Sequence, residues 1–172
     1  MMALEHGIAR LVEEFIAAGR PSSRERNIDD RRAGYVASAV LAGESETRVQ
    51  VDDVMLEGMH FRVVSPQNAA GPLPTVIYYH GGCFVSGGFA THDKQWRQLA
   101  YDSGCRVIAV QYRLAPEQTF PAAHDDAEQG AQIIRRHAEP LGVDASQITL
   151  AGDSAGGHLA LVTALRLKAA GG

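Results

Sequence analysis

The chain of 172 residues is long enough to bury one core and too short for two domains of ordinary size. Its formal net charge of −4 leaves no basic excess, which argues against nucleic acid and favours a small or neutral partner. Charged residues interrupt the apolar positions at the amino terminus, so we expect no signal peptide, no membrane span and no membrane partner. Cys83 and Cys105 have neither disulfide-framework nor zinc-ligand spacing, which is typical of a protein in a reducing cytoplasm.

The first third of the chain predicts two helices and a hairpin. Apolar residues recur every three or four positions over residues 4–16, and Gly19 follows, which predicts an amphipathic helix. We expect the mixed-charge stretch 22–32 to be a solvated linker, and a second helix to run from about residue 28 to 41. Residues 47–65 alternate apolar and polar side chains on both sides of a Glu-Gly turn, which predicts an antiparallel hairpin.

The rest of the chain alternates apolar runs with helical patterns. The runs cover residues 75–82, 105–112 and 148–152, and helical patterns surround Trp96 and span residues 122–138. Strands that are apolar throughout and alternate with helices indicate a parallel sheet buried on both faces. We therefore predict an α/β fold with a mixed sheet, antiparallel in its first hairpin and parallel afterwards.

A serine lies between two close glycines just after the last apolar run. The motif consists of Gly152, Asp153, Ser154, Ala155 and Gly156. It matches GxSxG, in which a tight strand-to-helix turn strains the serine and exposes its oxygen, while a Cβ at either glycine would strike the neighbouring strand or helix. A glycine-free apolar helix follows, so we interpret the serine as a nucleophile rather than an ordinary turn residue, and Asp153 as a structural hydrogen-bonding group.

A second motif, His-Gly-Gly-Cys-Phe, follows the first apolar run of the sheet. An acyl-transfer serine needs donors aimed at the oxygen that becomes negative, and small residues let backbone N–H groups approach it. The predicted oxyanion hole uses Gly81, Gly82 and Cys83, with Ala155 as a further donor at a helix start. We expect His80 to brace this loop by hydrogen bonding rather than to remove a proton.

Three blocks of the sequence resemble the hormone-sensitive lipase family of α/β hydrolases, namely HGGCFVSGG, VQYRLAPEQTFPAAHDD and ITLAGDSAGGHLA. The resemblance covers roughly residues 45–172. It implies an α/β-hydrolase fold and a carboxylesterase that acts on short-chain esters, with Ser154 as the nucleophile and no metal or organic cofactor. It also implies that residues 1–44 form a helical cap segment, and that residues 45–172 are the amino-terminal part of the catalytic domain.

The sequence departs from the family pattern in two places. Cys83 replaces a glycine, so a left-handed backbone there would be costly, and we interpret it as a tolerated small residue rather than a redox or nucleophilic group. The family order is serine, acid, histidine, yet only His158 and no carboxylate side chain follow the serine. Since His158 should point along its helix, we expect the acid and histidine to lie outside this chain, with a carboxy-terminal segment or an associating chain covering an exposed sheet edge.

Other interpretations remain open from the sequence. The chain could be a catalytically incomplete fragment, a truncated binding or interaction protein, or part of an amide hydrolase of arylformamidase type. His92, His124 and His137 are expected to be surface or satisfied core histidines.

Overall fold

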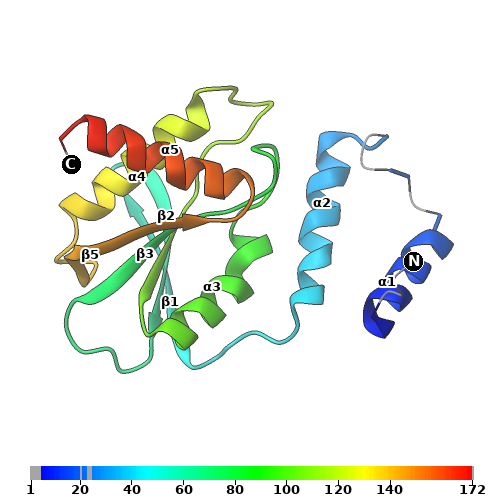
Figure 1. Cartoon of the computed structure of the whole chain (residues 1–172), viewed down its shortest axis with the longest axis horizontal. Coiled ribbons are helices and arrows are strands. Elements are labelled where there is room, and N and C mark those ends of the chain that lie inside the picture. Colours follow the sequence, from blue (N-terminus) through cyan, green and yellow to red (C-terminus); the bar gives the residue numbers. More distant parts are fainter. Residues whose placement is uncertain (1–4, 20, 23–24, 172) are drawn as a thin grey trace.

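A five-stranded sheet lies between two layers of helices (Figure 1). The computed structural model describes residues 5–19, 21–22 and 25–171. The helices are α1 (His6–Ala17), α2 (Ile28–Ser38), the 3-10 turn η1 (Ala39–Ala42), α3 (Phe89–Ser103), α4 (Ala122–Arg136) and α5 (Ala155–Ala169). The strands are β1 (Val49–Leu56), β2 (Met59–Pro66), β3 (Leu73–Tyr79), β4 (Arg106–Val110) and β5 (Val143–Gly152). None of the described helices has the length and apolar character needed to cross a bilayer.

The strands are ordered β1, β2, β4, β3, β5 across the sheet. β1 pairs antiparallel with β2 and β2 antiparallel with β4, whereas β3 lies parallel to both β4 and β5. This arrangement confirms the predicted mixed sheet. The hairpin turns at Glu57 and Gly58, both with left-handed backbone (φ 50° and 80°), which matches the twist of the strands they join.

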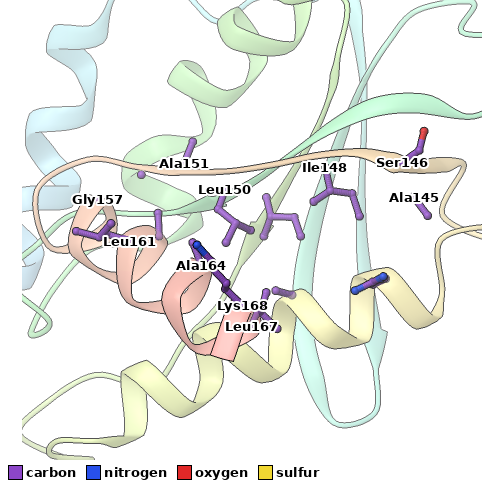
Figure 2. Close-up of a pocket in the computed structure, with 15 residues that line it drawn as sticks. Ala145, Ser146, Ile148, Leu150, Ala151, Gly157, Leu161, Ala164, Leu167 and Lys168 are labelled. Carbon is purple, nitrogen blue, oxygen red and sulfur yellow. The ribbon is translucent and has the colours of Figure 1, made fainter. Parts of the chain in front are cut away.

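β5 lies at one edge of the sheet, and an apolar groove runs beside it. In Figure 2, Ile148 and Leu150 of β5 point toward the helices that form the other side of the groove. Leu161 and Leu165 of α5 are 62% and 59% exposed. The described structure therefore leaves apolar surface of both β5 and α5 uncovered.

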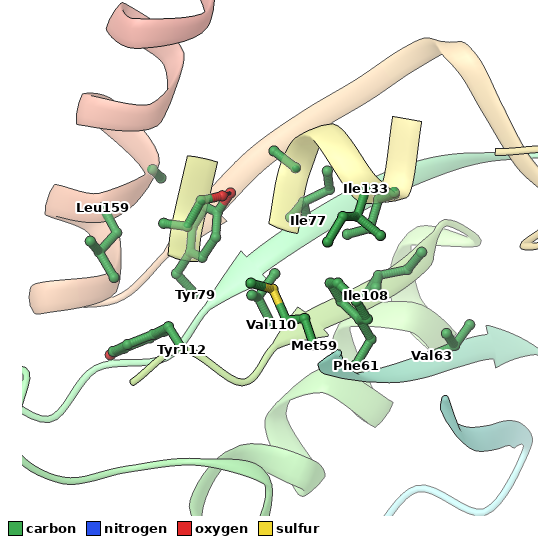
Figure 3. Close-up of a cluster of buried hydrophobic side chains, with 14 of the residues drawn as sticks. Met59, Phe61, Val63, Ile77, Tyr79, Ile108, Val110, Tyr112, Ile133 and Leu159 are labelled. Atoms are coloured by element: carbon green, nitrogen blue, oxygen red, sulfur yellow. Dashed lines mark hydrogen bonds between the residues drawn. The ribbon is translucent and has the colours of Figure 1, made fainter. Parts of the chain in front are cut away.

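The buried side chains of the sheet face two separate layers. Trp96 of α3 is fully buried against one face, whereas Ile133 of α4 and Leu159 of α5 are fully buried against the other (Figure 3). In β3, Tyr79 faces the α4 and α5 layer and Tyr78 faces α3, because side chains alternate along a strand. Burial on both faces explains why these strands are apolar runs in the sequence.

We predict that Gly156→Ala lowers the free energy of unfolding by about 3 kcal/mol, because overpacking that meets a rigid backbone is costly. A Cβ on Gly156 would overlap the carbonyl group of Tyr79, so α5 would have to move away from β3. In the matched control Gly34→Ala, the Cβ would meet only the flexible guanidinium of Arg26, at 3.1 Å. That control should be neutral or up to about 1 kcal/mol stabilising. Urea denaturation curves measure both changes, and equal midpoints for the two variants would contradict the prediction.

Candidate active site

Ser154 occupies a tight turn between the end of β5 and the start of α5. Its backbone angles are φ 51° and ψ −118°, a sparsely populated region for a residue with a side chain, and the residue is exposed. A Cβ on Gly152 or Gly156 would overlap backbone atoms of the opposite element, so only glycine permits this close approach. The turn has the strained geometry that the GxSxG pattern predicts, while the role of Ser154 as nucleophile stays a prediction.

The loop after β3 contains three successive residues with positive φ. Gly82, Cys83 and Phe84 have φ of 126°, 56° and 61°, so Cys83 adopts the left-handed backbone that is costly for its side chain. Within the described residues, the N–H groups of Gly82, Cys83 and Ala155 donate no hydrogen bond. These three amides are free to bind an external oxygen.

Asp153 ties the serine turn to this loop. Its Oδ1 atom accepts a hydrogen bond from the Gly81 N–H at 2.9 Å and from the Tyr78 hydroxyl at 3.2 Å, and lies 3.3 Å from His92 Nε2. Burial, reinforced by the Asp153 charge, raises the pKa of Tyr78 and keeps its hydroxyl a donor. The Gly81 amide already donates its hydrogen bond to Asp153, so it holds the loop in place. Unlike the other three predicted oxyanion donors, it is not free to bind an external oxygen.

His80 is fully buried at the base of the loop. Its ring stacks on Tyr112 with centroids 4.2 Å apart, and its Nδ1 lies 2.8 Å from the carbonyl oxygen of Gly81. Burial lowers the pKa of His80 to about 4, so the ring is neutral at pH 7 and can donate its Nδ1 proton to that carbonyl. The buried His80 ring is therefore placed to support the loop by this hydrogen bond.

Arg32 of α2 also contacts this loop, and the sequence pattern did not predict it. Its Nε donates to the carbonyl oxygen of Val85 at 2.8 Å, its Nη2 donates to that of Ala115 at 3.0 Å, and its guanidinium pairs with Glu117 at 2.6 Å. The prediction that residues 22–32 are a solvated linker is therefore wrong for Arg32. Mixed charge alone could not reveal a partner 53 residues away.

The histidines of the chain have neighbours other than the serine. His158 places its Nε2 3.1 Å from Nε2 of His124, and His137 lies 3.0 Å from Oε1 of Glu57. His92 is buried, as expected of a core histidine. No described side chain forms a hydrogen bond with the hydroxyl of Ser154, and no three His, Cys, Asp or Glu residues in the described part of the chain are placed to hold a metal ion.

A sequence profile described as the alpha/beta hydrolase fold matches residues 76–172, which include both the loop and the serine turn. The chain belongs to the hormone-sensitive lipase family of α/β hydrolases. It is 36% identical over 169 residues to an ethyl acetate hydrolase of Pseudomonas putida, an alignment that covers 93% of this chain and 53% of that protein. Esterase LipI of Mycobacterium tuberculosis is 46% identical over 99 residues, 58% of this chain and 31% of its own.

Solved structures of family members superpose on the whole chain. A thermostable esterase from Pseudomonas putida matches with a TM-score of 0.92 and 29% identity, covering 100% of this chain and 55% of that one. A hyperthermophilic esterase from the archaeon Pyrobaculum calidifontis matches with a TM-score of 0.85 and 39% identity, covering 99% and 56%. The chain thus spans about half the length of these relatives and is a partial version of an esterase fold.

We predict that His80 makes the protein less stable in mild acid. The pKa of His80 is about 4 in the folded state and near its ordinary value of 6.5 in the unfolded state, so the unfolded chain takes up the proton first. Stability is therefore fully present above about pH 6.5 and falls as the pH drops toward 4, by on the order of 3 kcal/mol. Urea midpoints of the parent and of His80→Asn, measured from pH 7.5 to 4, test this. The variant should show a flatter pH dependence, and parallel curves would contradict the assignment.

Proposed function

We propose that this chain supplies the nucleophile and the oxyanion hole of a serine carboxylesterase that acts on short-chain esters. The observation that carries the proposal is the exposed, strained Ser154 beside the free amides of Gly82, Cys83 and Ala155. Donors fixed in advance around a developing negative charge are the main source of rate enhancement in acyl transfer. The relatives named as esterases support the same reaction class.

In the proposed mechanism, Ser154 Oγ attacks the ester carbonyl carbon as its proton passes to a histidine base. The carbonyl oxygen becomes negative and accepts hydrogen bonds from the amides of Gly82, Cys83 and Ala155. The tetrahedral intermediate then expels the alcohol, which takes the proton, and leaves an acyl-enzyme that water hydrolyses. Asp153 and Gly81 position the loop throughout and undergo no chemical change.

We infer that the base and its acid lie outside this chain. His158 is the one histidine that follows the serine in sequence, and its Nε2 faces His124. Relatives are nearly twice as long as the aligned region, which leaves room for both groups. The part that supplies them would also cover the groove of about 780 Å³ beside β5, where Leu161 is exposed.

The test uses a polypeptide extended to the length of the relatives. In it, Ser154→Ala should lower kcat for p-nitrophenyl butyrate by at least about 10⁴-fold, because loss of the nucleophile lowers kcat by roughly a million-fold in a model serine protease. Ser146→Ala is the matched control, because Ser146 is exposed and its hydroxyl bonds only to Asp144. The butyrate should also be hydrolysed with higher kcat/KM than the palmitate. Full activity in Ser154→Ala, or preference for palmitate, would refute the proposal, and faster turnover of an anilide would favour an amide hydrolase.

The 172-residue chain by itself should associate through its uncovered apolar groove. We expect light scattering to detect species larger than a monomer, and Leu161→Lys, which places a charge on the wall of the groove, to shift the distribution toward monomer. Leu41→Lys is the control, because Leu41 is equally exposed (67%) but lies on η1, away from the groove. A monodisperse parent chain, or an equal effect of Leu41→Lys, would show that the groove does not drive association.

A further inference from the structure

Two histidine rings from different helices meet at the surface next to the loop after β3. His124 lies in the first turn of α4 and His158 near the start of α5, and their Nε2 atoms are 3.1 Å apart. The proposed esterase mechanism uses neither ring. We propose that His124 and His158 form a binding site for one divalent transition-metal ion, such as Zn²⁺, Ni²⁺ or Cu²⁺, a property that goes beyond the proposed esterase function.

The distance between the two rings suits a shared metal ion. A metal ion binds a histidine nitrogen at about 2.0–2.1 Å, so two nitrogens that subtend about 100° at one ion lie about 3.1 Å apart, with ring centroids about 5 Å apart. The observed values are 3.1 Å between the Nε2 atoms and 5.2 Å between the centroids. An ion that took the place of the proton between the two nitrogens would therefore leave their separation almost unchanged.

Phe84 limits the freedom of both rings. Its own ring lies 5.6 Å from that of His124 and 5.9 Å from that of His158, measured between centroids. A pair of ligands that is already positioned loses less conformational entropy when an ion binds. Since Phe84 follows Cys83 directly, the pair also lies beside the loop proposed to bind the oxyanion.

The positive charge nearest to the histidine pair is held in ion pairs. Arg166 pairs with Asp125 at 3.0 Å and with Glu128 at 3.3 Å, so two carboxylates offset its charge. Nδ1 of His124 is buried and has no partner among the described residues, so the Nε2 contact with His158 decides which nitrogen of the ring carries the proton. A metal ion would bind both Nε2 lone pairs by displacing the proton in this contact, which leaves each neutral ring protonated on Nδ1.

The donor set determines which ions bind. No third His, Cys, Asp or Glu joins the pair within the described part of the chain, so water would complete the coordination. Imidazole nitrogen suits zinc, nickel and copper, whereas Mg²⁺ prefers oxygen ligands. Affinity should therefore follow the order Cu²⁺ above Ni²⁺ and Zn²⁺, with no measurable binding of Mg²⁺.

The proposal is tested by equilibrium dialysis of the untagged 172-residue chain against Ni²⁺ and Zn²⁺. Bound metal is counted per chain, so the result does not depend on whether the chain is a monomer or an oligomer. We expect one ion per chain, and a roughly tenfold or greater loss of affinity in both His124→Asn and His158→Asn, equivalent to about 1.4 kcal/mol or more. His137→Asn is the matched control for adventitious binding at a surface histidine beside a carboxylate. Cys83→Ser controls for thiolate binding, and both controls should bind as the parent does.

Three results would overturn the proposal. The first is no metal binding below about 1 mM, and the second is an affinity that falls in only one of the two single variants. The third is a loss of affinity in His137→Asn as large as in His124→Asn and His158→Asn. Electron paramagnetic resonance of bound Cu²⁺ provides a second readout, in which two coordinated nitrogens in the parent should become one in each single variant. Because these experiments measure binding and not ester turnover, their failure leaves the proposed esterase function untouched.

Discussion

The close backbone contact between α5 and β3 is the constraint on which the rest of the site depends. Gly156 lies so near the carbonyl group of Tyr79 that no side chain fits between them. This contact places the start of α5 directly beside the end of β3. The serine turn and the loop that begins at His80 are therefore adjacent because the two elements that carry them are in contact, and the hydrogen bond from the Gly81 N–H to Asp153 joins them.

The loop after β3 needs support because its backbone is strained. Cys83 and Phe84 both have left-handed angles, which cost roughly 1–3 kcal/mol each for residues with side chains. Asp153 binds the loop from the serine turn, and Arg32 binds it from α2. Two charged groups from different elements thus bind a loop whose backbone is strained. Such support matters because donors that must reorganise during reaction lose much of their electrostatic advantage.

Periodicity and local motifs were sufficient to predict the elements, the mixed sheet and the serine turn. These features depend on neighbours within a few residues, and the exposed turn at Ser154 follows from glycines two positions away. The sequence could not show that the Gly81 amide is occupied, because its acceptor, Asp153, lies 72 residues away. The same holds for Arg32, and for the meeting of His124 and His158, which are 34 residues apart. Pairings at such separations depend on how helices pack on the sheet, which local patterns do not encode.

The strand order has a consequence for how the site is assembled as the chain is made. Synthesis proceeds from the amino terminus, so β3 and its loop leave the ribosome well before β5. Until residue 153 emerges, the Gly81 amide has no carboxylate to bind, and the edge of β3 that β5 later occupies is open. The loop after β3 therefore acquires its final shape late, when β5 pairs beside it, and the nascent chain passes through a stage in which chaperones can reach an unpaired edge of β3.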